Sequence, residues 1–174
     1  PTVAAAKSLL EDGALGQPLW AIIHSSHYLP DWRPSQDYAQ GYTADEATGG
    51  VLFDFIHEFD LANHLLGPAE TLLAAARNTG AIDIPSEDCA DVVLRHASGV
   101  HSSLHLDYVT RPKRRSIQIG GDKGVLGVDL IAQEVTLTGV DGAEINHQNF
   151  SAMDFNDCYV REMAAFIECI DRNS

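Results

Sequence analysis

The sequence has few cysteines, few basic residues and no long apolar run. Its three cysteines, Cys89, Cys158 and Cys169, are odd in number and form no C-x-x-C pair. This pattern argues against a disulfide framework or a cysteine-based zinc site and favours a reducing, cytoplasmic compartment. Eleven Lys and Arg stand against 25 Asp and Glu, a formal net charge of −14, so nucleic acid and membrane surfaces are poor candidate partners. No apolar run approaches the roughly 20 residues that span a bilayer.

The beginning of the sequence also lacks two features. There is no initiator Met, since the only methionines are Met153 and Met163, and the first seven residues have none of the regions of a signal peptide. The sequence begins within a periodic pattern and ends directly after a helical one. We therefore expect it to be part of a longer protein, in which these 174 residues form one domain with a sizeable core.

Hydrophobic periodicity predicts two helices around a long loop, then a series of strands, then a third helix. The helices are expected at Thr2–Glu11, Val51–Leu66 and Phe155–Ile170. The strands are expected at Leu19–Tyr28, Glu70–Ala76, Cys89–His96, His101–Val109, Arg114–Ile119, Val125–Leu130 and Glu134–Thr138. The aromatic-rich segment from Leu29 to Gly50 indicates an ordered, functional loop. Helices segregated from a run of antiparallel strands predict an α+β fold.

The second predicted helix carries polar residues on a largely apolar surface, so we expect it to be mostly buried. Its broad apolar face, at about 100° per residue, comprises Leu52, Phe55, Phe59, Ala62 and Leu66. Asp54, His57 and Asp60 are three residues apart, so both carboxylates can meet the imidazole. Carboxylates orient such a ring and favour its charged form, which makes His57 a candidate proton donor or acceptor. Glu58 and His64 are assigned to solvated edges, without a role.

Two other interpretations of these residues stay open. One of the aspartates could simply satisfy a buried histidine or cap backbone amides. His57 with Asp54 and Asp60 could also bind a divalent ion, although zincin spacing is absent and no second histidine lies one turn from His57, so no metal ligand is assigned. His24 and His27 point to opposite faces of their strand and cannot both be ligands there.

The stretch GGVLFDFIHEFD at Gly49–Asp60, followed by Leu65-Leu66-Gly67, resembles the substrate-domain signature of the Gfo/Idh/MocA oxidoreductases. That signature runs Gly-Gly, a few apolar residues, an acid, the active-site His and an Asp three residues further on. One departure is that the acid commonly lies four residues before the His, whereas Asp54 lies three before His57. Other similar segments follow in the expected order, at Glu11–Gly16, Tyr28–Pro34 with Asp37-Tyr38 (a Trp-Arg-Pro loop found in one branch), Ile119–Leu126 and Tyr159–Phe166.

The resemblance implies an NAD(P)-dependent oxidoreductase that moves hydride between a nicotinamide and a sugar, polyol or related hydroxylated substrate. No G-x-G-x-x-G follows a strand in this sequence, so NAD or NADP would be bound mainly by an absent N-terminal Rossmann domain. Residues 1–174 would then be the C-terminal substrate-binding and oligomerisation domain, inactive alone and without cofactor-binding residues. Its fold would be an open, mainly antiparallel sheet with helices packed on one face, as in the glyceraldehyde-3-phosphate-dehydrogenase-like C-terminal domain.

Six residues receive candidate roles in this scheme. The candidate catalytic residues are His57, Asp54 and Asp60, and the candidate substrate-binding residues are Trp32, Arg33 and Tyr38. His57 would contact the reacting hydroxyl together with a lysine of the absent domain, and Asp54 or Asp60 would orient it. Arg33 would bind hydroxyls or a carboxylate of the substrate. Equally, the aromatic residues of this loop could simply hold it on the sheet.

A non-catalytic oligomerisation or scaffold module is the competing function, and a divalent-metal enzyme is a third. A wide sheet with helices on only one side leaves a face that needs covering, so we expect a homo-oligomer to form through that face. The candidate residues are Val92, Leu94, Leu104, Leu106 and Tyr108 in one set, against Val93 and Val109 in the other. The sequence does not assign which set faces outward.

Overall fold

The computed structural model describes residues 1–154 and 156–172. The helices are Thr2–Glu11 (α1), Val51–Asp54 (α2), Ile56–Leu66 (α3) and Asn156–Arg172 (α4). The strands are Pro18–Ser26 (β1), Ala69–Arg77 (β2), Cys89–His96 (β3), His101–Asp107 (β4), Arg114–Gly121 (β5), Gly124–Asp129 (β6), Glu134–Gly139 (β7) and Glu144–Asn149 (β8). Three short 3-10 helices lie in the long loop, at Leu29–Asp31, Tyr38–Gln40 and Tyr42–Ala44.

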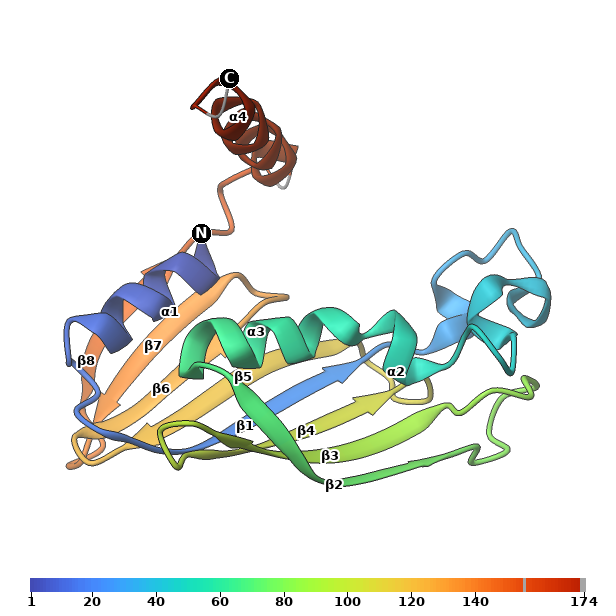
Figure 1. Ribbon diagram of the computed structural model, residues 1–174, viewed down its shortest axis with the longest axis horizontal. Coiled ribbons are helices and arrows are strands. Elements are labelled where there is room, and N and C mark those ends of the chain that lie inside the picture. Colours follow the sequence, from blue (N-terminus) through green and yellow to red (C-terminus); the bar gives the residue numbers. More distant parts are fainter. Residues whose placement is uncertain (155, 173–174) are drawn as a thin grey trace.

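The strands form one eight-stranded sheet in the order β2-β3-β4-β1-β5-β6-β7-β8. Only the central pair β1 and β4 is parallel; the other neighbours are antiparallel. Helices α1 and α3 lie across one face of the sheet (Figure 1). The predicted α+β class, with an open, mainly antiparallel sheet and helices on one face, is therefore confirmed. Strand β8 was missed, because the sequence EINHQN has one apolar residue and no alternation.

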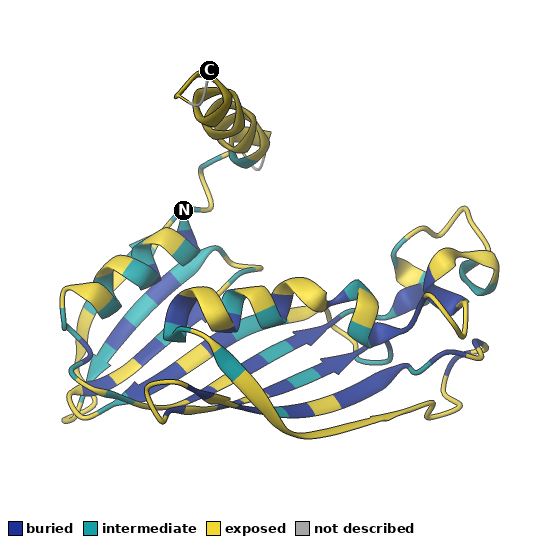
Figure 2. Ribbon diagram, viewed as in Figure 1, coloured by how far each residue is buried: buried dark blue, intermediate teal, exposed yellow. Residues whose placement is uncertain are grey.

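The hydrophobic core lies between the helices and the face of the sheet that they cover. Ala21 and Ile23 of β1 and Leu104 of β4 are buried there, and the alternation of buried and exposed residues follows the strands (Figure 2). Burying one side chain of this size contributes about 1.5–3 kcal/mol. A second apolar cluster, which includes Leu29 and Tyr108, packs under the long loop, so the expectation that this loop is ordered is correct.

The structure assigns the two faces of the sheet that the sequence left open. The set that lies under the helices and the loop is Val92, Leu94, Leu104, Leu106 and Tyr108. The opposite face, which we call the open face, carries the other residues of each strand. Its exposed apolar side chains are Trp20 and Ile22 of β1, Leu73 of β2 and Val125 of β6.

The predicted helix over 51–66 is interrupted, and the expectation of one largely buried helix is wrong in two respects. The backbone leaves helical geometry at Phe55, with φ −97° and ψ 25°, between α2 and α3. The ring of Phe55 packs against Trp32 and Tyr108, which fixes this turn. The outer side of the segment faces solvent, since Phe53 is 64% and Ile56 60% exposed.

The segment begins at Gly50, whose φ of +88° is one that side chains rarely tolerate. A Cβ there would meet the Glu87 carboxylate at 2.2 Å. This carboxylate accepts a hydrogen bond from the backbone N–H of Leu52 at 3.2 Å, and the Gly50 carbonyl accepts one from the hydroxyl of Tyr108 at 3.0 Å. The Gly-Gly pair thus fixes the start of α2 against the strands.

Helix α4 extends away from the sheet (Figure 1), and none of its described residues is buried. Its predicted apolar stripe is present and exposed, comprising Val160, Met163, Ile167 and Ile170. The expected first residue, Phe155, lies outside the described residues.

In the part of the chain that the structure describes, the helices are too short or too polar to cross a membrane.

Candidate active site

A cleft of about 400 Å³ opens where β1 ends, beside the junction of α2 and α3. Its lining residues are Ser25, Ser26, His27, Trp32, Arg33, Asp54, Phe55, His57, Lys113 and Arg115. Three of them, Arg33, Lys113 and Arg115, are cationic. The cleft is therefore a positively charged, polar hollow in a chain whose formal net charge is −14, and His57 lies at its edge.

The first turn of α3 places His57 beside a buried carboxylate. Glu58 is fully buried because it shares the inward stripe of α3 with Ala62 and Leu65. The Nε of Arg115, on β5, donates to Glu58 Oε1 at 2.7 Å, and the Nε2 of His57 lies 3.1 Å from the same oxygen. The assignment of Glu58 to a solvated edge is therefore wrong, whereas His64 is exposed as expected.

The charge state of Glu58 determines what His57 can do. Burial raises the pKa of the Glu58 carboxyl, but the hydrogen bond from His57 and the charge of Arg115 outweigh it and hold the pKa below its usual value. Glu58 is thus ionised at neutral pH and can only accept hydrogen bonds. The Nε2 of His57 must then carry a hydrogen, which leaves Nδ1 as the acceptor when the ring is neutral. The His57 side chain is 47% exposed, so a substrate can reach it.

The two aspartates expected to flank His57 have different surroundings. Asp54 lines the cleft, and its Oδ1 accepts a hydrogen bond from the hydroxyl of Tyr42 at 2.6 Å, which raises the pKa of that tyrosine. Asp60 is exposed on α3 and is not part of the cleft lining. In the described part of the chain, the carboxylate paired with His57 is Glu58. The turn at Phe55 accounts for the difference, because it removes Asp54 from the surface of α3.

A divalent ion on Asp54, His57 and Asp60 has no geometric support. Among the described residues, the triads of possible ligands with atoms within 4.8 Å of one another lie elsewhere, on strands β1, β3 and β4. The three residues of the second predicted helix do not form such a triad.

The three predicted substrate-binding residues, Trp32, Arg33 and Tyr38, together line a smaller pocket beside the cleft, and two of them also line the cleft itself. Trp32 lines the cleft and also serves packing, since its Nε1–H donates to the His27 carbonyl at 3.1 Å and its ring contacts Phe55 and Tyr108. Arg33 lines the cleft from an exposed position. Tyr38 lines the smaller pocket but not the cleft, and its hydroxyl accepts a hydrogen bond from the N–H of Asp83 at 3.3 Å.

Sequence reasoning missed several polar residues of the cleft besides Glu58. Lys113 and Arg115 belong to the stretch Arg-Pro-Lys-Arg-Arg at 111–115, which holds four of the eleven basic residues of the chain. A basic cluster in an otherwise acidic sequence was a signal from which the cationic lining of the cleft could have been predicted. His27 was considered only as a metal ligand; burial and the charge of Lys113 lower its pKa, so its ring is mostly neutral at pH 7.

Comparisons with known proteins find similarity to dehydrogenases and other oxidoreductases. A D-apiose dehydrogenase from Paraburkholderia graminis is 33% identical over 146 residues, covering 83% of this chain and 32% of its own length. An oxidoreductase from Agrobacterium radiobacter, solved in complex with NAD+, L-tartaric acid and magnesium, is 27% identical with a TM-score of 0.67, covering 88% of this chain and 45% of its own. The apo form of levoglucosan dehydrogenase is 16% identical and shares the fold, with a TM-score of 0.81 over 98% of this chain and 54% of its own.

The chain therefore spans between about a third and about half of the length of these relatives. A family model described as the GFO/IDH/MocA C-terminal domain matches residues 3–127, more than two thirds of the sequence. This match agrees with the resemblance carried by Gly49–Asp60. The chain belongs to the GFO/IDH/MocA C-terminal domain family.

Proposed function

We propose that residues 1–174 form the substrate domain of an NAD(P)-dependent oxidoreductase that acts on a sugar or a related hydroxylated compound. The observation that carries this proposal is the cleft in which a reachable imidazole, His57, is backed by an ionised, buried Glu58. A histidine held in one tautomer by a carboxylate is suited to proton transfer at a hydroxyl. The named activities of the relatives, D-apiose dehydrogenase among them, support the same reaction class.

The chain's own residues would handle the proton and position the substrate. His57 Nδ1 would accept the proton of the reacting hydroxyl, and Glu58 would stabilise the resulting imidazolium through Nε2. Arg115 keeps Glu58 ionised and so sustains this role. A nicotinamide cofactor, when bound, supplies the hydride acceptor.

The cofactor would be bound mainly by a separate Rossmann domain. In the described residues, the glycine-rich stretch at 120–124 is the turn of the β5–β6 hairpin and does not join a parallel strand to a helix. It therefore does not form the phosphate-binding turn that a dinucleotide needs. The sequence has an odd number of cysteines and no C-x-x-C pair, which favours a reducing location, so we place the protein in the cytoplasm.

The cations of the cleft suggest which substrates to compare. Arg33 can bind hydroxyls singly or a carboxylate with two parallel hydrogen bonds. Neutral sugars such as D-apiose and hydroxy acids such as L-tartaric acid, which the names of the relatives print, are therefore the two classes to test.

The function is tested with the full-length protein, by following NAD+ or NADP+ reduction with a panel of neutral sugars and hydroxy acids. We expect turnover with at least one class. Arg33→Ala should raise KM about tenfold or more while leaving kcat within a few-fold, because a group that binds ground and transition states equally affects KM alone. Arg95→Ala, an exposed arginine on β3 outside the cleft, is the matched control. Absence of turnover with every sugar and hydroxy acid would contradict the proposal.

We also propose that a second copy of this chain packs against the open face. Trp20, Ile22 and Val125 expose apolar surface close together there, since only Gly120 separates Trp20 from Val125 in the register, and contiguous exposed apolar surface commonly marks an interaction site. Leu73 adds exposed apolar surface further along the same face. Trp20 lies over Gly120 of the neighbouring strand, where a Cβ would come within 2.2 Å of its ring, so the indole is held flat against the sheet.

Sedimentation velocity checks this association. The wild-type protein should sediment as a dimer or larger, and Ile22→Lys should shift it toward the monomer, because a buried charge at the interface costs several kcal/mol. Ile56→Lys, at an exposed position of α3 on the other side of the sheet, is the control of equal chemistry. A wild-type protein that stays monomeric at high concentration would rule out the open face as a self-association surface.

A further inference from the structure

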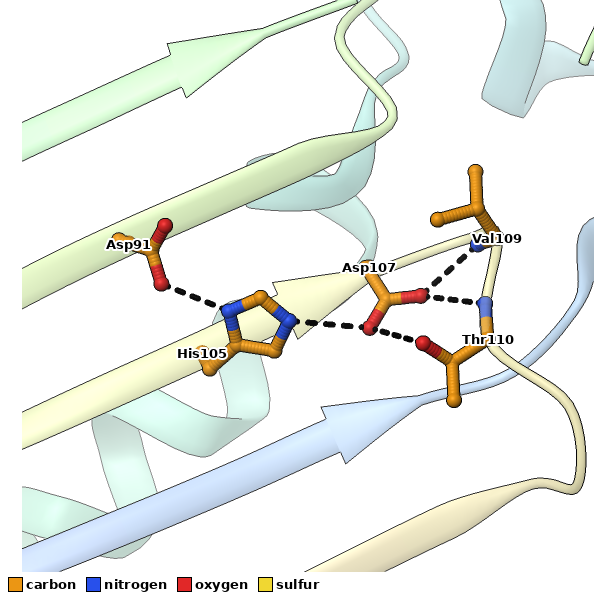
Figure 3. Close-up of polar contacts among 5 residues, drawn as sticks. All are labelled: Asp91, His105, Asp107, Val109 and Thr110. Atoms are coloured by element: carbon orange, nitrogen blue, oxygen red, sulfur yellow. Dashed lines mark hydrogen bonds and ion pairs between the residues drawn. The ribbon is translucent and has the colours of Figure 1, made fainter. Parts of the chain in front are cut away.

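A cluster of histidine and aspartate side chains lies on the open face, on the opposite side of the sheet from α3. The register of three neighbouring strands aligns Asp91 of β3, His105 of β4 and His24 of β1 in one row. Asp107 follows two residues along β4, so it has the same orientation as His105. Figure 3 shows the ring of His105 between the carboxylates of Asp91 and Asp107.

The distances within the cluster are short. His105 Nδ1 lies 2.6 Å from Asp91 Oδ1, and His105 Nε2 lies 3.2 Å from Asp107 Oδ2. The rings of His24 and His105 are edge to face, with centroids 5.1 Å apart. The Nε2 of His24 is buried and has no hydrogen-bond partner among the described residues, an arrangement that is unfavourable unless something else satisfies the nitrogen.

The geometry points to a binding site for a divalent metal ion of the zinc class, with His24, His105 and Asp107 as the protein ligands. Ligand atoms of these three residues already lie within 4.8 Å of one another. Two imidazoles and one carboxylate are a donor set that zinc and similar ions accept, with a fourth position left for water. The ion would also supply the missing partner of His24 Nε2.

The groups around the three ligands are those that a metal site requires. A metal-bound histidine usually donates its second ring N–H to a carboxylate, which is the contact that Asp91 makes with His105 Nδ1. The other oxygen of Asp107, Oδ1, accepts the backbone N–H groups of Val109 and Thr110 at 2.8 and 2.6 Å. These bonds fix the carboxylate with Oδ2 directed at His105 (Figure 3).

Charged groups of both signs lie near His24. Asp107 is on the neighbouring strand β4, and Arg114 is on the neighbouring strand β5. Asp91 and Asp107 supply negative charge at the ligand atoms. The groove of about 580 Å³ that includes His24 is lined further out by Lys113, Arg114 and Arg115 and by Asp129.

A second possible triad shares His105 with Cys89 and Asp91. An ion there would bind His105 through Nδ1 and would displace the 2.6 Å contact with Asp91. It would also leave His24 Nε2 without a partner. An ion on His24, His105 and Asp107 instead keeps the contact between Asp91 and His105 and provides a partner for His24 Nε2, so this is the site we propose.

The test is calorimetric titration of the purified, chelator-treated protein with Zn²⁺. We expect one ion per chain in the wild type and an upward shift of the thermal unfolding midpoint at saturation. His24→Ala and His105→Ala should each weaken binding by more than about 100-fold, since even outer-sphere partners commonly contribute 10–100-fold. Asp91→Asn, which removes the carboxylate that holds His105 Nδ1 and its charge but no metal ligand, should weaken binding by about 10–100-fold.

Two variants serve as matched controls. His101→Ala removes another exposed histidine of β4 on the same face, and Cys89→Ser removes the distinctive ligand of the second triad. Both should bind zinc as the wild type does. Circular dichroism of each metal-free variant establishes that it is folded. The proposal is overturned if the wild type binds no zinc, if His24→Ala binds it as tightly as the wild type, or if Cys89→Ser alone abolishes binding.

Discussion

Replacing His57 by alanine in the full-length protein is expected to lower kcat by about 100-fold or more. A positioned general acid or base typically contributes 10²–10⁴-fold to the rate. His57 is the residue of the cleft whose ring is reachable and whose Nε2 is fixed on an ionised carboxylate, so its Nδ1 is available for the proton. Initial rates of nicotinamide reduction with the best substrate measure the effect, and kcat should fall more than KM changes.

His64→Ala is the matched control for this experiment. His64 is an exposed histidine in the last turn of the same helix, outside the cleft, so its removal should leave kcat unchanged. The pH profile gives an independent readout, because loss of the group that accepts the proton should remove the corresponding ionisation from kcat/KM. A fall of less than about tenfold in His57→Ala would exclude a direct proton role for this residue.

The fold was largely predictable because its main elements follow simple periodicities. Strands β4, β5 and β7 alternate apolar and polar residues, and turn residues separate the strands from β3 to β7, so the existence and order of these strands could be predicted from the sequence. Strand β8 forms without such a pattern, because its antiparallel pairing with β7 holds it in the sheet although its own side chains are mostly polar. The orientation of the sheet could not be read from β3, since the run Val92-Val93-Leu94 offers apolar residues to both faces.

The candidate site was predicted only in part, and Glu58 shows why. A helical wheel through 51–66 favoured the stripe of Leu52, Phe55, Phe59 and Leu66 and placed Glu58 at the edge. The break at Phe55 rotates α3 relative to that wheel, so that Glu58 joins Ala62 and Leu65 on the inward side. A periodic analysis assumes a continuous helix, and the packing of Phe55 that breaks it involves residues distant in the sequence.

Arg115, the partner of Glu58, could not be predicted from the local sequence for the same reason. Arg115 lies 57 residues further along the chain, and the two meet only because β5 is placed next to β1 under α3. A carboxylate spaced with the apolar residues of a helix is nevertheless a usable signal, since buried charges are rarely left unpaired.

Replacing Arg115 by methionine is expected to destabilise the protein by about 3 kcal/mol. Removing one partner of a buried ion pair leaves the other charge without compensation and commonly costs 3–5 kcal/mol. Arg115 is 32% exposed, so water can partly replace it and the lower end of that range applies. The free energy of unfolding from urea titrations at pH 7 measures the effect.

Arg95→Ala removes the arginine of the exposed pair with Glu70 on the same sheet, and it should cost less than about 1 kcal/mol. The double variant Glu58→Leu with Arg115→Met should recover most of the stability that Arg115→Met loses, because no charge is then left buried. Equal destabilisation by the two arginine variants would contradict a buried, energetically important Glu58–Arg115 pair.

The pH dependence of stability should differ between the wild type and these variants. Since the folded-state pKa of Glu58 lies below its unfolded value, the stabilisation from this group is present above the unfolded pKa and is lost as pH falls through the folded one. The stability difference between wild type and Glu58→Gln, an isosteric variant that does not titrate, should therefore shrink below about pH 4.5. In Arg115→Met the pKa of Glu58 should be higher than in the wild type, because the guanidinium charge no longer lowers it, so the stabilisation from ionised Glu58 should be lost at a higher pH than in the wild type. Parallel pH curves for all three proteins would show that Glu58 is not the charged centre of this site.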